Sequence, residues 1–455
     1  MTILLLLVLI ITEIGFAAFE LSRRTTRGEW ATRRLCVSGL ELLTYLILTL
    51  LPGIDFGFRF TVLLAVLVIQ IIISGIFWLI KRKNGKIKGR PSIVVRTLVG
   101  IVILAMAMGP AFMFKDYHGL PTTGDNEIAE CSAILIDDSR VDEFENDGSN
   151  CEVGLHFFYP KNVEKMKAHS LPLVIFSHGA FGYYQSNMST YMELASHGYV
   201  VISLDHPHHA FYTTDSEGKT IIVDRDYIQS AMDVGNGVYD PEKEFELTSE
   251  WMKLRLADMN FVIDNVKSAA ASGPDSAWAF GDDENAGEVS KALAGIDTKK
   301  IGLMGHSLGG ATSVTAGRRG DVSAVIDFDG TMLGEVKDVR EDGENICNEE
   351  PYPTPVLDFR NQEHQEDCEE AVKQGKDYVN NVIIENAVDG YSTYVKNSGH
   401  MNFTDLPLFS PFLANMLGTG DVDPKYCIEQ VNSVTLNFFD CYLKGEGTFT
   451  VQESY

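Results

Sequence analysis

Four apolar runs occupy most of the first 114 residues of this 455-residue chain. They cover residues 3–19, 35–51, 60–80 and 93–114. A helix needs about 20 apolar residues to cross the ~30 Å hydrocarbon core of a bilayer, and shorter runs are accommodated when the bilayer thins or flanking side chains reach the interface. The sequence therefore predicts an all-α module of about four transmembrane helices over residues 1–114.

The first two runs are shorter than the others, and each holds one acidic residue, Glu13 or Glu41. A secretory signal peptide is the alternative for the first run, but that run lacks a basic segment before it and a cleavage site of small residues after it. Ionisable residues inside a membrane segment normally mark function or a polar contact between helices. Because both runs are marginal, we assign Glu13 and Glu41 no catalytic role.

Basic residues predict the orientation of this module. Two loops are strongly basic, the first with Arg23, Arg24, Arg27, Arg33 and Arg34, the second with Lys81, Arg82, Lys83, Lys86, Lys88 and Arg90. The connection between the second and third runs holds only Asp55 and Arg59. Basic loops face the cytoplasm. We therefore expect a multi-pass protein of the cell membrane, with residues 115–455 forming an extracytoplasmic domain.

The charge of the chain is divided between these two parts. The formal net charge is −26, with 13 basic and 5 acidic residues in residues 1–114 against 24 and 58 in residues 115–455. A nucleic-acid partner needs a basic surface, so the charge balance argues against nucleic-acid binding. The acidic part is long enough to bury a large core. The sequence gives no indication of the oligomeric state.

Six of the seven cysteines lie in the acidic part, at positions 131, 151, 347, 368, 427 and 441. An even number of cysteines in an extracytoplasmic domain predicts disulfide bonds, with six unpaired thiols as the alternative. No Cys/His spacing is typical of zinc, so we expect no metal and no cofactor. A calcium site is one interpretation of the acidic stretch 282–288, but we favour a solvated loop within residues 273–297.

Apolar runs in residues 115–455 alternate with helical patterns, as a mostly parallel sheet flanked by helices requires. Buried strands are expected at residues 173–176, 199–204, 301–304, 322–328 and 355–359, with antiparallel edge strands near 132–136 and 153–158. Residues 249–266 have helical apolar spacing, and residues 207–247 read as an insertion or loop over the sheet edge. The sequence predicts one α/β domain.

The segment Gly305-His306-Ser307-Leu308-Gly309 directly follows one of these strands. In a GxSxG motif the serine lies in a strained turn between a strand and a helix, and the flanking glycines let the backbone pass without a clash. The context fits, since a helix-permissive segment follows. We therefore expect Ser307 to be a nucleophile, with an ordinary strand-to-helix turn as the alternative.

A nucleophilic serine needs a histidine to take its proton and a carboxylate to orient that histidine, in the chain order Ser, acid, His. His400 lies in a loop of small residues after an apolar alternation and is the expected base, whereas His364 lies in a polar run and reads as a surface residue. Asp327 and Asp329 both end the preceding strand and share a face, so the pattern alone does not separate them. Asp329 is closer to the loop. Asp358 and Glu363 accompany the next strand.

The tetrahedral oxyanion of such a reaction needs two backbone N–H donors. One belongs to the residue after the nucleophile, Leu308. The segment Ser177-His178-Gly179-Ala180 follows an earlier strand in the manner of an HG-type oxyanion loop. Ala180 is therefore the expected second donor, with a plain glycine-containing turn as the alternative.

Four of these segments resemble the lipoprotein-associated (type II) platelet-activating-factor acetylhydrolases and their bacterial relatives among the serine esterases. The segments are residues 172–179 with 194–199, residues 305–312, Phe328-Asp329-Gly330-Thr331-Met332, and Gly399-His400-Met401-Asn402-Phe403-Thr404-Asp405. The resemblance covers about residues 150–445 and selects Asp329 over Asp327. It implies an α/β-hydrolase fold without a metal cofactor, acting on carboxylic esters, often short or oxidised acyl chains of phospholipids.

Two departures accompany the resemblance. The membrane module has no counterpart in secreted members, and the stretch before Ser307 does not match. Polyester and triglyceride lipases share the same motif and remain alternatives, as does an extracytoplasmic acyltransferase. A non-enzymatic alternative is a membrane-anchored sensory or binding ectodomain. The sequence favours hydrolysis of a carboxylic ester, either a small molecule or a lipid, through Ser307, His400 and Asp329.

Overall fold

The computed structural model describes all 455 residues and divides into two compact units. The first, here the helical unit, comprises Met1–Tyr117 together with Phe409–Leu413. The second, here the sheet unit, comprises His118–Leu408 and Ala414–Tyr455. Each unit has its own buried core, so each is described by itself.

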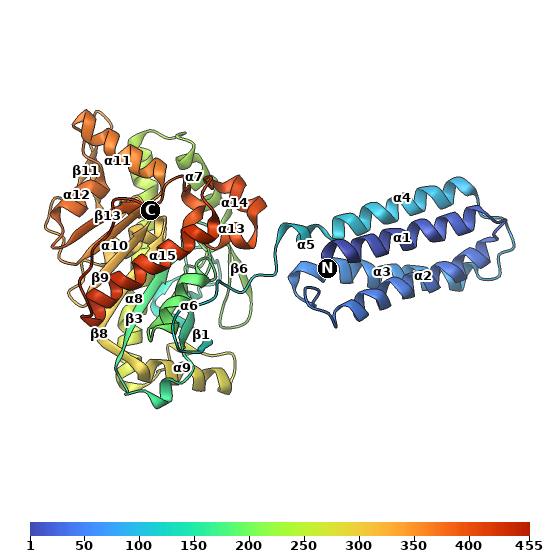
Figure 1. Cartoon of the computed structure of the whole chain (residues 1–455), viewed down its shortest axis with the longest axis horizontal. Coiled ribbons are helices and arrows are strands. Elements are labelled where there is room, and N and C mark those ends of the chain that lie inside the picture. The colour runs from blue at the N-terminus through green and yellow to red at the C-terminus, as the bar shows by residue number, and fades with distance from the viewer. The chain divides into compact units, whose positions relative to one another are not determined.

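The helical unit is a bundle of four long helices (Figure 1). These are α1 (Thr2–Leu21), α2 (Arg27–Leu48), α3 (Phe58–Lys81) and α4 (Arg90–Ala107), followed by the short α5 (Gly109–Met113). Three of them, α1, α3 and α4, are long and apolar enough to cross a membrane. Helix α2 is not among these, because its sequence includes Arg33, Arg34 and Glu41. The expectation of about four spans is therefore supported for three helices, as candidates.

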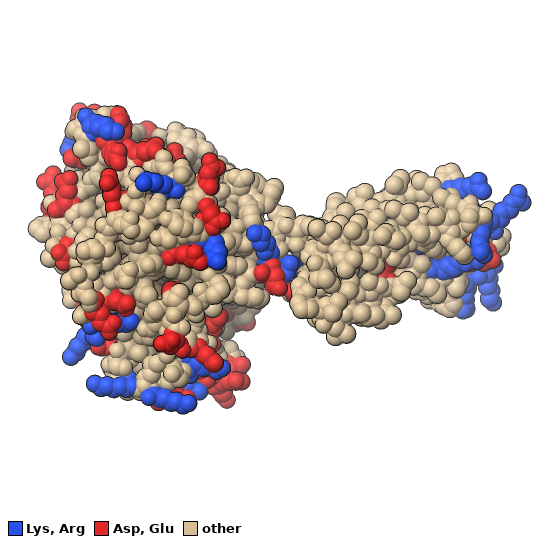
Figure 2. All heavy atoms as spheres, viewed as in Figure 1, with Lys and Arg blue, Asp and Glu red and all other residues tan.

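Both basic loops lie at the same end of the helical unit. The backbone N–H of Arg27 donates to the carbonyl of Lys86 at 2.8 Å, and that of Lys88 donates to Thr25 at 2.9 Å. Figure 2 shows Lys and Arg side chains gathered at this end, while the sides of the bundle are almost free of charge. This arrangement is the one that the distribution of basic residues requires if the bundle crosses a membrane.

The two acidic residues of the apolar runs are buried inside the bundle. Arg34 Nη1 donates to Glu13 Oε1 at 2.6 Å, and Arg34 Nη2 lies 3.7 Å from Glu41 Oε2. Both carboxylates are about 1 % exposed. A buried charge is costly unless it is paired, so Arg34 joins α1 and α2 through a polar contact between helices.

The sheet unit contains a nine-stranded mixed sheet in the order β13-β12-β9-β8-β3-β4-β2-β1-β7. Six strands from β13 to β4 run parallel, and β2, β1 and β7 add antiparallel at one edge. The strands are β1 (Ile128–Val141), β2 (Asn150–Pro160), β3 (Leu171–Ser177), β4 (Val200–Asp205), β7 (Trp278–Ala279), β8 (Ile296–His306), β9 (Ala324–Phe328), β12 (Val356–Arg360) and β13 (Gly390–Tyr394). The expected strands and the expected antiparallel edge are confirmed.

Helices cover both faces of this sheet, as Figure 1 shows. Side chains alternate along each parallel strand: Leu173 and Ile175 join one core, whereas Val174 and Phe176 join the other. The first core includes side chains from α8 (Pro241–Ser272), α9 (Asp283–Gly295), α10 (Leu308–Ala316) and α12 (Val379–Asn386). The second includes side chains from α6 (Met188–Ser196) and α15 (Pro424–Phe439). The result is a three-layer α/β fold.

The smaller elements lie in the connections between the strands of the main sheet or follow its last strand, β13. They are the hairpins β5–β6 (Tyr212–Thr214, Thr220–Ile222) and β10–β11 (Val336–Val339, Asn345–Cys347), and the helices α7 (Arg225–Gly235), α11 (Gln362–Gln374), α13 (Leu406–Phe409) and α14 (Pro411–Leu417). The short helical turns are η1 (Val163–Lys165), η2 (Leu333–Glu335), η3 (His400–Phe403) and η4 (Asp440–Lys444). Residues 207–247 are thus largely ordered as a hairpin and helices.

The predicted acidic loop is a helix for much of its length. Asp282 caps α9, its side chain accepting from the N–H of Asn285 at 2.8 Å, and Asp283 and Glu284 occupy the first turn. Acidic residues are favourable there because the helix N-terminus carries a partial positive charge. The expectation of a solvated loop was therefore wrong over residues 283–295, where the carboxylates start a helix.

The prediction of disulfide bonds is contradicted, since all seven cysteines are free thiols. Cys131 and Cys151 lie on paired strands but six residues out of register, opposite Phe157 and Asp137, which separates them by roughly 20 Å at ~3.4 Å per residue. Cys427 and Cys441 lie 14 residues apart along one continuous helical segment, again roughly 20 Å. Such separations exceed the reach of a disulfide.

Candidate active site

Ser307 lies in the turn between β8 and α10. Its backbone has φ 56° and ψ −126°, a conformation that costs a residue with a side chain about 1–3 kcal/mol. The N–H of Ser307 donates to the carbonyl of Phe328 at 2.9 Å, which ties the turn to the end of β9. This is the strained strand–turn–helix geometry that the sequence motif predicts.

Close backbone contacts explain the glycines on either side of Ser307. A Cβ on Gly305 would overlap the carbonyl of Gly309, and a Cβ on Gly309 would overlap the carbonyl of Ser177 at the end of β3. Only a residue without a side chain fits at these two positions. The two glycines therefore let α10 start directly against the neighbouring strand, which presents Ser307 at the carboxyl edge of the sheet.

The loop after β3 brings Ala180 to the same place. A Cβ built on Gly179 would lie only 3.2 Å from the Cβ of Ser307, so this loop passes directly beside the serine. The N–H of Ala180 donates no hydrogen bond within the protein. Leu308 is the first residue of α10, and N–H groups in the first turn of a helix have no acceptor inside it. Both predicted oxyanion donors thus adjoin Ser307.

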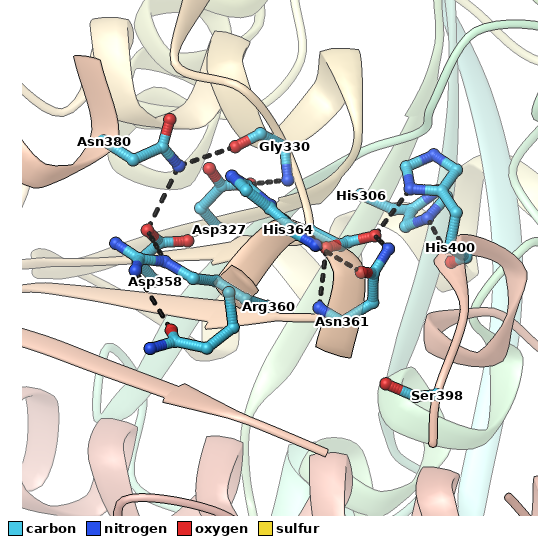
Figure 3. A network of polar contacts seen from close by, with 12 residues as sticks. His306, Asp327, Gly330, Asp358, Arg360, Asn361, His364, Asn380, Ser398 and His400 are labelled. Carbon is cyan, nitrogen blue, oxygen red and sulfur yellow. Dashed lines mark hydrogen bonds and ion pairs between the residues drawn. The ribbon is translucent and has the colours of Figure 1, made fainter. Parts of the chain in front are cut away.

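Asp329 and His400 are joined by a short hydrogen bond (Figure 3). Asp329 follows β9 with φ 56°, and His400 begins η3. The Nδ1 of His400 lies 2.6 Å from Oδ2 of Asp329, and the His400 side chain remains 38 % exposed. The structure thus brings the predicted acid and base together. It forms no hydrogen bond between Ser307 and His400, a contact that is often long in enzymes without substrate.

His306, beside Ser307 in sequence, connects the serine turn to the His400 loop. Its Nε2 lies 3.1 Å from the carbonyl of His400, and the two rings lie 4.5 Å apart between centroids. A carbonyl only accepts, so this nitrogen of His306 carries the proton. Burial lowers the pKa of His306 to about 3. A neutral His306 therefore holds the backbone of His400 next to Ser307.

A second histidine, His364, shares the carboxylate of Asp329 (Figure 3). Its Nδ1 lies 3.1 Å from Oδ1 of Asp329, and Asn361 donates to both oxygens, each at 2.7 Å, through its backbone and side-chain N–H groups. The interpretation of His364 as a surface residue was wrong: it is 8 % exposed. The signal that sequence reasoning missed is Asn361, which caps α11 and turns His364 inward.

These donors determine the charge at Asp329. Burial alone would raise the pKa of its carboxyl, but the hydrogen bonds from His364 and His400 hold that pKa well below its usual range. Burial likewise opposes protonation of His364, and the hydrogen bond to Asp329 overcomes it and raises the pKa of His364 to about 12. Asp329 is therefore an anion whose Oδ1 is paired with His364 and whose Oδ2 binds His400, while Asn361 donates to both oxygens.

This pairing predicts a pH-dependent stability. The folded state keeps a proton on His364 up to a pKa of about 12, whereas an unfolded histidine loses it near pH 6.5. The stabilisation is therefore complete below about pH 6.5 and declines as the pH rises toward 12, by at most about 1.4 kcal/mol per pH unit. We expect wild type to have a larger free energy of unfolding than His364→Gln, and we expect this difference to be larger at pH 6 than at pH 9. Denaturant titrations followed by tryptophan fluorescence measure it, and a difference that stays constant or grows with pH contradicts the pairing.

Asp327, the other acid left open by the sequence pattern, has a different environment. It lies opposite Asp358 on the adjacent strand β12, and burial together with the charge of Asp358 raises the pKa of Asp327 well above its usual value. Its Oδ1 accepts only from the N–H of Gly330, at 2.9 Å. Asp358 instead accepts from Arg360 Nε at 2.7 Å and Asn380 Nδ2 at 3.1 Å. Neither carboxyl bonds a histidine.

A second Ser–His–Asp chain lies behind the site. Ser177 Oγ is 2.8 Å from His206 Nε2, and His206 Nδ1 is 2.9 Å from Asp258 Oδ2. Its serine and histidine are fully buried and Asp258 is 3 % exposed. The backbone of Ser177 is covered by Gly309. No ester carbonyl reaches a serine in that position, so this chain is a buried polar network beneath the surface site.

Comparison with known proteins identifies the family of this chain. The family model of platelet-activating factor acetylhydrolase, isoform II, matches residues 158–453. The chain belongs to this family. The match contains all five predicted site residues, and the sheet unit has an α/β-hydrolase fold.

Individual relatives are distant. The platelet-activating factor acetylhydrolase of Bos taurus is 24% identical over 282 residues, and that of Cavia porcellus is 25% identical over 286 residues. Each alignment covers 60% of this chain and 57% of the relative, so the chain spans little more than half the length of these relatives. A ferulic acid esterase from Streptomyces cinnamoneus shares the fold, with a TM-score of 0.50, 21% identity, and coverage of 72% of this chain and 93% of that chain.

The described residues hold no group of three or more His, Cys, Asp or Glu side chains that could bind a metal ion. The expectation that the reaction needs no metal and no cofactor stays a prediction.

Proposed function

We propose that this protein is a serine carboxylic ester hydrolase. The observation that carries the proposal is the position of Ser307 at a strained turn. The Gly179–Ala180 loop passes beside this turn. His306, which precedes Ser307 in the chain, binds the backbone of His400, and His400 is paired with Asp329. A nucleophile, a base with an oriented imidazole and two free backbone donors are the parts that acyl transfer to water requires.

In the proposed mechanism each residue has one role. Ser307 Oγ attacks the acyl carbonyl while His400 Nε2 takes its proton, and Asp329 holds His400 by its Nδ1–H and stabilises the imidazolium. The N–H groups of Leu308 and Ala180 stabilise the oxyanion. His400 then protonates the leaving alcohol, and a water activated by His400 releases the acid from Ser307.

The surroundings of the two donors favour an acyl chain rather than a charged group. Leu308 belongs to a cluster of buried apolar residues, and Ala180 packs against it. The cluster also includes Phe181, Val223, Tyr227, Trp251, Met252 and Leu333. The relatives are named as acetylhydrolases of platelet-activating factor, which indicates an acetyl group as the acyl part of their substrate. We propose short-chain or phospholipid-type acyl esters as the substrate class here.

We further propose that the helical unit anchors the protein as a multi-pass membrane protein, with the active site outside. The apolar α1, α3 and α4 and the two basic loops at one end of the bundle support this placement. By the positive-inside rule the basic end faces the cytoplasm.

One labelling experiment tests both proposals. A membrane-impermeant fluorophosphonate, added to intact cells that express the full chain, should label the protein on Ser307, because the probe reacts only with an activated serine that it can reach. Labelling after lysis alone would overturn the orientation and leave the chemistry standing. If the folded protein is labelled under neither condition, or is labelled on another serine, the proposed function is wrong.

A further inference from the structure

Arg255, on helix α8, is the largest fully buried side chain of the protein. Such a cation is costly to bury unless strong hydrogen bonds compensate for the lost water. Arg255 forms no ion pair with a carboxylate. The nearby Asp258 is instead bound by Arg140, at 2.8 Å, and by His206, at 2.9 Å. The guanidinium of Arg255 therefore binds groups other than carboxylates.

The guanidinium of Arg255 binds the backbone of the loop that follows β3. Its Nη1 donates to the carbonyl of His178, and its Nη2 donates to the carbonyl of Gly179 at 3.2 Å. Its Nε lies 3.3 Å from Nδ1 of His209, whose pKa burial lowers far enough to keep that ring neutral and able to accept. One planar side chain thus binds two consecutive peptide groups beside Ser307, and the Gly179 carbonyl also accepts from the N–H of Gly182 at 3.1 Å and from Nδ1 of His178 at 2.7 Å.

The orientation of a peptide group links its carbonyl to the next N–H. In a trans peptide the carbonyl of one residue and the N–H of the following residue point in opposite directions. Because Arg255 holds the carbonyl of Gly179 toward the protein interior, the N–H of Ala180 points the other way. That N–H has no acceptor within the protein, and the loop passes directly beside Ser307.

We propose that Arg255 is a positioning residue for the oxyanion hole: it orients the Gly179–Ala180 peptide so that the Ala180 N–H faces the developing oxyanion, and it places a fixed positive charge behind that donor. The inference rests on the proposed function. Leu308, the other donor, is held by α10 and does not depend on Arg255. Loss of Arg255 therefore loosens one of two donors, whose peptide keeps only its contacts with Gly182 and His178.

The test compares kinetic constants of the full chain in detergent with p-nitrophenyl acetate as substrate. Full removal of one oxyanion donor lowers kcat by about 10²–10³-fold. Arg255→Met loosens that donor, so we expect kcat to fall by about tenfold or more, up to this limit, with KM changed by less than about threefold. Arg255→Lys keeps the positive charge but lacks the planar guanidinium that binds both carbonyls. We therefore expect its kcat to lie between that of wild type and that of Arg255→Met. The inhibition constant of a trifluoromethyl ketone, which mimics the tetrahedral intermediate, should rise in parallel with the fall in kcat.

Arg318→Met is the matched control. Arg318 also donates to two backbone carbonyls, those of Glu350 and Pro351, and pairs with Glu335, but it lies outside the oxyanion loop. We expect this variant to lose thermal stability and to keep kcat within about threefold. If Arg255→Met does not fold, Arg255→Lys decides the outcome.

Two results would overturn the inference. One is a folded Arg255 variant that keeps wild-type kcat, and the other is a loss confined to KM with unchanged affinity for the ketone. A failure of the proposed function looks different, because the wild-type protein itself would then neither hydrolyse the ester nor react with a fluorophosphonate.

Discussion

Ser307→Ala should lower kcat for ester hydrolysis by about 10⁴-fold or more, with little change in KM. Removal of the nucleophile of a Ser–His–Asp triad leaves only the contribution of the oxyanion hole and of substrate binding. The protein should remain folded, because the backbone of Ser307 rather than its hydroxyl holds the turn, through the 2.9 Å bond to Phe328. Alanine accepts the positive φ at a cost similar to that of serine. Initial rates with p-nitrophenyl acetate and a thermal melt measure the two expectations.

Ser177→Ala is the control that separates the two serine–histidine–aspartate chains. Ser177 forms a hydrogen bond to a histidine, at 2.8 Å, which Ser307 does not, yet Ser177 is fully buried. We expect its loss to cost about 1 kcal/mol of stability, the usual value of one hydrogen bond, and to leave kcat within about tenfold of wild type. A 10⁴-fold loss in Ser177→Ala with an active Ser307→Ala would reverse the assignment.

Asp329→Asn should cost both activity and stability. An amide in place of the carboxylate no longer favours the imidazolium or the correct tautomer of His400, which in a triad lowers kcat by about 10⁴-fold. The same change leaves the buried cation of His364 without its partner, and breaking a buried pair in this way costs about 3–5 kcal/mol. Activity loss together with a large fall in the unfolding free energy is therefore expected, measured by steady-state kinetics and by denaturant titration.

Asp327→Asn is the matched control for this prediction. Asp327 is the same residue type, fully buried, two positions earlier, and burial together with the charge of Asp358 raises its pKa well above the usual value, which favours the neutral carboxyl. An amide closely resembles a neutral carboxyl, and we expect kcat within about tenfold of wild type and a small change in stability. Equal losses in both variants would show that Asp329 acts only through the fold. A larger loss of kcat in Asp327→Asn would identify the wrong acid.

The strands of the sheet could be predicted because their apolar runs are long and bounded by turn residues. The strained turn at Ser307 could be predicted because the motif states a steric requirement, which the contacts of Gly305 and Gly309 display directly. In these cases local sequence and tertiary structure impose the same condition. The choice between Asp327 and Asp329 required the resemblance to a family.

Other features depended on contacts between distant segments. His364 lies in a polar run, and only the placement of Asn361 and Asp329 across two strands explains its burial. The pairing of cysteines depended on strand register, which separates Cys131 from Cys151 although both belong to one hairpin. The role inferred for Arg255 has no sequence signal, because a guanidinium that binds carbonyls leaves no motif.

The free cysteines bear on how the protein is made. Burial raises the pKa of Cys151 and Cys347 to about 11, and that of Cys131 and Cys427 to about 12. At neutral pH hardly any thiolate forms at these positions, and thiol–disulfide exchange proceeds through the thiolate. The fold of the sheet unit contains no disulfide bond, so we expect it to form under reducing conditions, without an oxidant or a disulfide isomerase.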